Sequence, residues 1–184
     1  MSCYTNGIKV LLGVSGSIAA YKAADVVSAL KKRDIEVSVV MSKHACGFIT
    51  PLTMQALSQN YVYLDVLDEP VAEKIVHVDL PQSVDVFCLA PATANIIAKI
   101  AHGIADDQLS SMVLALPDAT RKVVAPAMNT VMLENAATRS NLETLRNRGW
   151  EVIEPRTARL ACGVEGRGAL ASVEDIVRAV LDER

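Results

Sequence analysis

Short, largely apolar segments alternate along this chain with longer segments whose apolar residues recur at helical spacing. The apolar runs lie at residues 8–12, 36–41, 85–90, 122–125 and 151–153. The helical pattern lies at residues 17–32, 52–58, 93–102, 106–116, 137–148 and 173–181. Strands that are apolar throughout, rather than at every second residue, are typical of a parallel sheet buried on both faces. The pattern therefore predicts an α/β fold, a doubly wound parallel sheet in a three-layer sandwich of the Rossmann or flavodoxin type.

One domain accounts for the whole chain, residues 1–184. The length suffices for one hydrophobic core, and no repeat, low-complexity stretch or linker interrupts the pattern. Ser172, with Asp175 three residues later, predicts the cap of the last helix. Apolar residues make up 51% of the chain and the mean hydropathy is +0.28, which is high for a soluble monomer. We therefore expect part of the apolar surface to be buried between subunits.

Membranes and nucleic acids are not expected partners. Residues 86–98 are thirteen uncharged positions interrupted by Pro91 and Asn95, whereas a membrane-spanning helix needs about 20 apolar residues. The chain does not open with a basic segment followed by an apolar one, so no signal peptide is expected. The net charge of −3 and the lack of a Lys/Arg run argue against a nucleic-acid surface.

The four cysteines, Cys3, Cys46, Cys88 and Cys162, lie far apart and form no C-x-x-C pair. This spacing fits neither a disulfide framework nor a zinc site, and no metal is expected. Reduced thiols, together with the missing signal peptide, predict a cytoplasmic protein.

Ligands of doubly wound sheets bind beyond the carboxyl ends of the strands, so the loops at 13–20 and 42–44 are the first candidates. In G-V-S-G-S-I-A-A, Gly16 permits a tight turn and Ser17 opens a helix whose free amides can hold a phosphate. A plain helix cap is the alternative interpretation. The second strand ends in Met41-Ser42-Lys43, where a dinucleotide-binding protein would offer an acidic residue to the ribose. A mononucleotide with one phosphate therefore fits better than NAD.

Two further loops follow later strands. In A-P-A-T-A-N, residues 90–95, Pro91 is expected to end the strand and Thr93 to stand at a helix start, where it could simply be an N-cap. In P-A-M-N-x-x-M, residues 126–132, Asn129 lies between two methionines where the chain should leave the core. The residues alone give no reason for that asparagine.

The segment 159–171 carries three glycines in six positions, which predicts a mobile loop rather than a helix or strand. Judged singly, Cys162 in this loop is more often a buried small side chain than a nucleophile. His77, in K-I-V-H-V-D-L, is likewise more often a core residue when seen alone. His44 and His102 belong to no motif of their own.

Taken together, these segments identify a family resemblance that runs nearly from end to end. The chain resembles the homo-oligomeric flavin-containing cysteine decarboxylases. The resemblance rests on G-S-I-A-A-Y-K, V-H-V-D-L, A-P-A-T-A-N-I-I-A-K-I-A-H-G-I-A-D-D, P-A-M-N-x-x-M and L-A-C-G-x-x-G-x-G, in this order. Each segment is a weak signal, but the ordered set is specific. In two-domain relatives an arginine stands where this chain has Ala169, so the chain looks like the single-domain branch.

The resemblance implies FMN as the cofactor, bound at subunit contacts in trimers or in dodecamers built from them. It places the phosphate at Gly16, Ser17, Ile18 and the turn Ser42-Lys43-His44. Thr93, Ala94, Asn95, Ile96 and Ala127 are implied around the ribityl chain and the ring. The implied substrate contacts are Asn129, Met132, Arg159, Ala161 and Leu170.

The resemblance also implies a reaction, the decarboxylation of 4′-phosphopantothenoylcysteine to 4′-phosphopantetheine in coenzyme A biosynthesis. Oxidation of the substrate to a thioaldehyde gives the carbanion left by CO2 an electron sink, and the resulting enethiolate is then reduced. By resemblance, His77 is the base of the oxidative half and Cys162 the acid of the reductive half. Asn129 would orient the carboxylate without the strong ground-state binding that a cation would give.

Two alternatives remain open at this point. A peptidyl-cysteine decarboxylase of the lantibiotic type would share FMN, the histidine and the asparagine, but would stop at the enethiol and not need Cys162. A regulatory subunit that binds FMN without turnover is the alternative from a different class. Such subunits usually carry long acidic tails, and this sequence ends at Arg184 without one.

Overall fold

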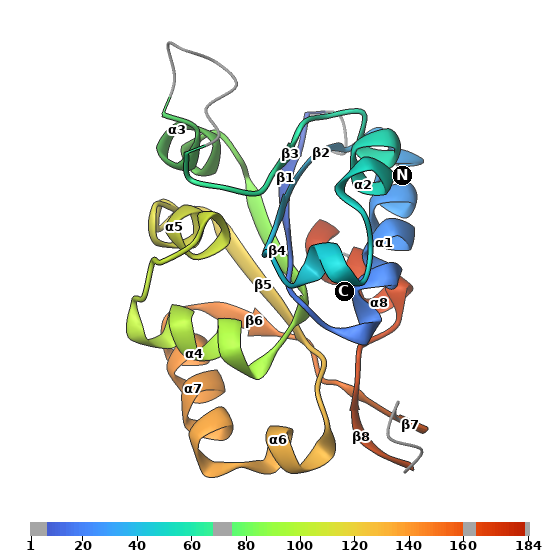
Figure 1. Cartoon of the computed structure of the whole chain (residues 1–184), viewed down its shortest axis with the longest axis vertical. Helices are drawn as coiled ribbons and strands as arrows, with labels where there is room; N and C mark the ends of the chain where they lie inside the picture. Colours follow the sequence, from blue (N-terminus) through green and yellow to red (C-terminus); the bar gives the residue numbers. More distant parts are fainter. Residues whose placement is uncertain (1–6, 68–74, 160–164, 183–184) are drawn as a thin grey trace.

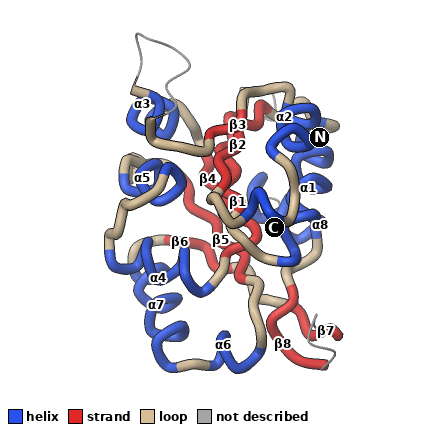
Figure 2. Tube along the Cα trace, in the orientation of Figure 1, coloured by secondary structure: helices blue, strands red, loops and turns tan. Residues whose placement is uncertain are grey.

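A parallel sheet lies at the centre of the molecule (Figures 1 and 2). The computed structural model describes residues 7–67, 75–159 and 165–182, and within them six parallel strands pair in the order β3-β2-β1-β4-β5-β6. The strands are β1 Lys9–Val14, β2 Glu36–Met41, β3 Val62–Tyr63, β4 Val86–Ala92, β5 Arg121–Pro126 and β6 Trp150–Val152. The chain starts in the middle of the sheet and turns outward in both directions, which is the doubly wound arrangement.

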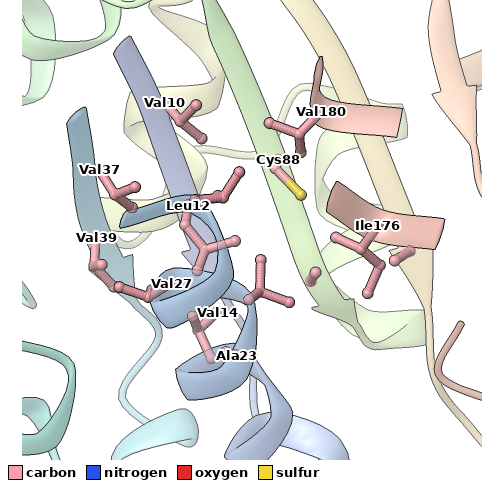
Figure 3. Close-up of a cluster of buried hydrophobic side chains, with 14 of the residues drawn as sticks. Val10, Leu12, Val14, Ala23, Val27, Val37, Val39, Cys88, Ile176 and Val180 are labelled. Carbon is pink, nitrogen blue, oxygen red and sulfur yellow. The ribbon is translucent and has the colours of Figure 1, made fainter. Parts of the chain in front are cut away.

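Helices cover both faces of this sheet. One face is covered by α1 Lys22–Lys31, α2 Pro51–Ser58 and α8 Val173–Leu181, and the other by α3 Val76–Gln82, α4 Ala94–His102, α5 Gln108–Leu114 and α7 Ala136–Asn147. Consecutive strand residues such as Leu11 and Leu12 are both fully buried but belong to different core clusters. Figure 3 shows the first of these clusters, with Val27 of α1 and Ile176 of α8 facing the strands. The predicted three-layer α/β fold is confirmed.

The predicted elements agree with the structure except at their ends. The strand at 36–41 and the helix at 173–181 have the predicted bounds. Ser172 caps that last helix, because its hydroxyl oxygen accepts the backbone N–H of Asp175 at 3.0 Å. The helix expected at 17–32 begins as a 3-10 turn, η1 Ile18–Tyr21, before α1. The helix expected at 106–116 is shorter, because Asp107 caps it and α5 starts at Gln108.

The prediction that Pro91 ends its strand is wrong. Strand β4 continues through Pro91 to Ala92, which pairs with Pro126 of β5 after an irregular step in register beyond Leu89. Proline removes one ladder donor, but its carbonyl remains an acceptor. Here that carbonyl accepts hydrogen bonds from Ser15, so the strand end is bonded to the loop after β1.

The prediction of a loop at 159–171 is also wrong for its described part. Strand β7 Arg156–Arg159 pairs with β8 Glu165–Ala169 in an antiparallel hairpin, and residues 160–164 lie outside the described residues. Arg156 pairs with Ala169 whereas Thr157 pairs with Arg167, so Gly168 is an extra residue on β8. A β-bulge of this kind accommodates glycine, and Gly168 has a φ of +144°. Glycines at 166 and 168 therefore do not prevent a strand.

Some elements were not anticipated from the sequence. These are the short strand β3, helix α3 around His77, the 3-10 turn η2 Ala45–Gly47 and the short helix α6 Thr130–Glu134. Among the described residues, none of the helices has the length and apolarity needed to span a bilayer.

Candidate active site

The predicted cofactor loops meet at one edge of the sheet. They follow the carboxyl ends of β1, β2, β4 and β5, and parallel strands bring such ends to the same edge. The order β2-β1-β4-β5 places the four loops side by side in the lower half of the molecule (Figure 1). Their contacts can therefore be followed from one loop to the next.

The loops after β1 and β2 touch at Gly16. A Cβ atom at Gly16 would lie 2.5 Å from His44 Cβ and 3.0 Å from the His44 carbonyl carbon, so only glycine fits. On either side of this contact, Ser17 Oγ accepts the Ala19 N–H at 3.2 Å and Ser42 Oγ accepts the Ala45 N–H at 3.3 Å. Both serines thus stand at the start of a turn with their backbone amides nearby. This is a fitting cradle for one phosphate.

The loops after β1 and β4 are joined by Ser15, which sequence reasoning missed. Its side chain is buried, at 2% exposure, and its hydroxyl donates to the Pro91 carbonyl at 2.8 Å. The same oxygen accepts the Thr93 N–H at 3.0 Å, and the Ser15 N–H also donates to Pro91. A serine directly after an apolar strand was the available signal, because a buried hydroxyl needs partners.

Thr93 is an N-cap, as the simpler interpretation held. Its hydroxyl oxygen accepts the Ile96 N–H at 3.4 Å and α4 begins at Ala94. Ala94 is half-buried and Asn95 is exposed, so both are accessible from outside the core. The Ile96 side chain is only 3% exposed and packs in the core, which leaves its backbone for a cofactor contact. Their contacts with FMN remain predictions.

The loop after β5 carries Asn129. It is anchored to the loop after β4, because the N–H of the buried Ala127 donates to the Ala92 carbonyl at 2.9 Å. Asn129 is exposed and caps α6, since its Oδ1 accepts the Val131 N–H at 2.8 Å. Because Oδ1 accepts this backbone bond, Nδ2 is the group of this side chain that can donate to a ligand. Met132, on the same short helix, is 50% exposed.

The β7–β8 hairpin contacts the Asn129 loop. The Met128 N–H donates to the Gly168 carbonyl at 3.0 Å. Leu170, just after β8, is buried at 1% exposure in the same cluster as Ala127, so its contact with substrate stays a prediction. The backbone of Arg159 ends β7. The Arg159 side chain, Ala161 and Cys162 lie outside the described part of the chain, and their roles also stay predictions.

His77 is not brought to these loops within one chain. It is half-buried in the first turn of α3, the helix that precedes β4. The chain then enters β4 beside the start of β1, where the Asp85 N–H donates to the Lys9 carbonyl at 2.9 Å. Figure 1 shows α3 at the upper end of the molecule and the β7–β8 hairpin at the lower end. Histidine and asparagine of one chain therefore lie at opposite edges of the sheet.

An ion-pair cluster connects α4 to the residues that precede α5. Lys99 Nζ lies 2.5 Å from Asp106 Oδ1 and 2.7 Å from Asp107 Oδ2. Burial alone would lower the pKa of Lys99, but the hydrogen bonds to the two carboxylates outweigh it and the pKa lies above its ordinary value. Burial would raise the pKa of Asp107, but the bonds from Lys99 and Ser110 hold it below its ordinary value.

Among the described cysteines, neither lies in a setting that activates a thiol. Cys88 is fully buried in the core, and burial, with the charge of Glu151, raises its pKa to about 12. Cys46 is half-buried near the Ser42 carbonyl, and burial raises its pKa as well. The reactive form of a cysteine is the thiolate, and the raised pKa disfavours that form in both residues.

Comparison with known proteins adds independent information. The family described as Flavoprotein matches residues 2–184. The chain is 47% identical over 175 residues to the probable phosphopantothenoylcysteine decarboxylase of Streptococcus mutans, covering 95% of this chain and 98% of that protein. It is 45% identical to the coenzyme A biosynthesis bifunctional protein CoaBC of Bacillus subtilis, covering 94% of this chain but only 42% of that protein.

Solved structures of cysteine decarboxylases have a similar fold. A mutant of PPC decarboxylase complexed with pantothenoylaminoethenethiol superposes with a TM-score of 0.86 at 32% identity, covering 96% of this chain and 97% of that one. The FMN-dependent cysteine decarboxylase SpaF superposes with a TM-score of 0.83 at 31% identity, with the same coverage of both chains.

Proposed function

This chain belongs to the Flavoprotein family, and from that premise we propose that it decarboxylates 4′-phosphopantothenoylcysteine to 4′-phosphopantetheine with FMN as cofactor. It is thus a lyase of coenzyme A biosynthesis. The observation that carries this proposal is the continuous contact between the loops after β1, β2, β4 and β5. These contacts bring Gly16, Thr93 and Asn129, each from a motif of the family, to one edge of the sheet.

The residues present fit FMN. Gly16 admits the close approach of the β1 and β2 loops, and Ser17 and Ser42 offer hydroxyls and turn amides to a phosphate. Thr93 and Asn95, at the start of α4, are placed next to this cradle by Ser15. FMN supplies hydride removal and return, which no side chain can perform.

The remaining roles belong to side chains around the substrate. Asn129 orients the carboxylate through Nδ2, and as a neutral donor it does not hold the ground state as a salt bridge would. Met132 adds an apolar wall. His77 accepts a proton in the oxidative half of the reaction. Cys162 donates a proton in the reductive half, because an unperturbed thiol is mostly protonated at neutral pH.

Product mass tests this function. The purified protein should be yellow, and with 4′-phosphopantothenoylcysteine it should release CO2 and 4′-phosphopantetheine. A product two hydrogens lighter would indicate an enzyme that stops at the enethiol, as peptidyl-cysteine decarboxylases do. A colourless protein that binds no added FMN, or a flavoprotein without turnover, would refute the proposal.

The proposed site requires a second copy of the chain, and we propose a homotrimer or a dodecamer built from trimers. His77 and Asn129 of one chain lie at opposite edges of the sheet, so they can share a site only across an interface. Large apolar side chains are available to bury: Tyr21 is 56%, Phe48 49% and Leu52 72% exposed. We also propose a cytoplasmic location, because cysteines that form no disulfide are typical of the reducing cytoplasm.

Subunit complementation tests the shared site. His77→Asn should be inactive alone, and Asn129→Ala should retain only a small residual activity. When the two variants are refolded together in equal amounts, about a quarter of the interfaces should combine an intact His77 from one subunit with an intact Asn129 from its neighbour. These sites should regain activity. No recovery from a mixed oligomer would contradict a site shared between copies.

A further inference from the structure

Gly168 occupies an unusual place in the β7–β8 hairpin. The register advances from the pair Thr157–Arg167 to the pair Arg156–Ala169, so Gly168 has no partner on β7. A bulged residue is released from the ladder, and its backbone groups can be redirected. The carbonyl of Gly168 accepts the Met128 N–H at 3.0 Å, which joins the hairpin to the residue before Asn129.

No other residue type fits at this point. The φ of Gly168 is +144°, which L side chains rarely adopt. A Cβ atom there would overlap the Met128 carbonyl oxygen and would lie 3.5 Å from the Asn129 carbonyl carbon. The glycine thus allows the backbone of β8 to lie directly against the backbone of the Asn129 loop.

The Asn129 loop is held from two sides as a result. On one side, the Ala127 N–H donates to the Ala92 carbonyl at the end of β4. On the other, the next amide, that of Met128, donates to Gly168. Asn129 follows immediately and caps α6 with its side-chain oxygen, so the direction of its amide depends on where these two bonds place the backbone.

We propose that Gly168 is a positioning residue that sets the position of Asn129 for decarboxylation. The proposal rests on the role of Asn129 in the function proposed above. Gly168 makes no contact with substrate in this proposal. It acts through Met128, by accepting one hydrogen bond and by lacking a side chain where the two backbones meet.

Gly168→Ala tests the contact directly. An ordinary C···O contact is about 3.3 Å, so the Met128 carbonyl would have to retreat by on the order of 1 Å. A displacement of that size near the reacting groups lowers kcat/KM by about 100-fold. Flavin content should stay at the wild-type level, because the phosphate cradle at Gly16 is formed by other loops.

Gly149→Ala is the matched control. Gly149 also has a positive φ, +79°, but a Cβ there would meet nothing within 4 Å. Both variants therefore place an alanine at a positive φ, which strains the backbone, but only Gly168→Ala also meets the backbone of the Asn129 loop. Gly149→Ala should lower the melting temperature and leave kcat/KM near the wild-type value. An equal loss of activity in both variants would overturn the proposal.

A double-mutant cycle separates positioning from general damage. If Gly168 acts through Asn129, then Gly168→Ala should cost less than about threefold in an Asn129→Ala background. Losses that multiply would overturn this inference alone and leave the proposed function intact. An Asn129→Ala variant with normal activity would remove the role of Asn129 and the inference with it.

Amide hydrogen exchange gives a readout that needs no activity. The Met128 amide should be protected in the wild type and in Gly149→Ala, and should exchange faster in Gly168→Ala. An unprotected Met128 amide in the wild-type protein would overturn the proposal, even where Gly168→Ala fails to fold.

Discussion

Ser15→Ala should weaken the connection between the loop after β1, where we propose that the FMN phosphate binds, and the start of α4. The Ser15 hydroxyl, 2% exposed, donates to the Pro91 carbonyl and accepts the Thr93 N–H, at 2.8 and 3.0 Å. The substitution removes one oxygen atom and creates almost no cavity. Its effect therefore reports on hydrogen bonding rather than on packing.

The two partners of Ser15 are affected differently. Pro91 keeps the Ser15 N–H as a donor at 3.2 Å, so the loss there is that of an ordinary hydrogen bond, about 0.5–1.5 kcal/mol. The Thr93 N–H loses its acceptor in a partly buried position, which costs about 1–3 kcal/mol. We expect a total loss of about 3 kcal/mol, which for a chain of this length lowers the melting temperature by roughly 6–12 °C.

Thermal unfolding of the flavin-free protein, with and without added FMN, measures both consequences. The melting temperature without FMN should fall, and the rise on adding FMN should be smaller than in the wild type, because the loops are no longer held together for binding. Ser111→Ala is the control, since that hydroxyl lies 3.5 Å from the Ala105 carbonyl near the surface. A Ser15→Ala protein that matches this control in both measurements would refute the reasoning.

Four further outcomes are expected. His77→Asn should keep its flavin but release no CO2, and near-normal turnover would return the histidine to a structural role. Cys162→Ser should yield a product two hydrogens lighter than 4′-phosphopantetheine by mass spectrometry; fully reduced product at the normal rate would contradict its role as the acid. Lys99→Met should cost about 1–2 kcal/mol in urea unfolding at pH 7. Folding lowers the pKa of Asp107 and raises that of Lys99, so both groups are charged in the folded and the unfolded protein from about pH 5 to 9, and the loss of stability should be constant over this range. The loss should shrink as the pH falls below about 4, where Asp107 takes up a proton. A loss that does not depend on pH would contradict the ion pair. Cys88 should resist iodoacetamide at pH 8 until urea is added, and its alkylation in the native protein would contradict its burial.

The sheet could be predicted from the sequence because burial on both faces leaves a strong signal. Leu11 and Leu12 point to opposite core clusters and both are fully buried, so no polar residue interrupts the run. Helix ends were less well predicted, because they depend on single hydrogen bonds. Asp107, for instance, starts α5 later than the apolar pattern suggests.

The short elements left no comparable signal. Strand β3 has two residues and α6 has five, which is too short for a repeated apolar pattern to be recognised. Helix α3 contains Pro81 and a Val-His-Val start, both unfavourable for a helix. Its formation depends on packing of Val76 and Leu80 against the core, which sequence alone does not reveal.

The candidate site could be predicted as a set of loops but not as a set of contacts. Gly16 and Ser17 were identified from local spacing, whereas the contact between Gly16 and His44 joins two different loops. Ser15 was missed for the same reason. Its partners are 76 and 78 residues away, and only the order of strands in the sheet brings them together.

The error at the β7–β8 hairpin has a physical cause that bears on function. Glycine disfavours a regular strand, which is why the glycines of this segment predicted a loop. The structure is a strand with a bulge, in which the residue least suited to the ladder accepts a hydrogen bond from Met128. A local preference that conflicts with the fold is expected where the backbone serves a site rather than the core. The position that the sequence pattern did not predict is thus the one where a Cβ atom would overlap the Met128 carbonyl oxygen, one residue before Asn129.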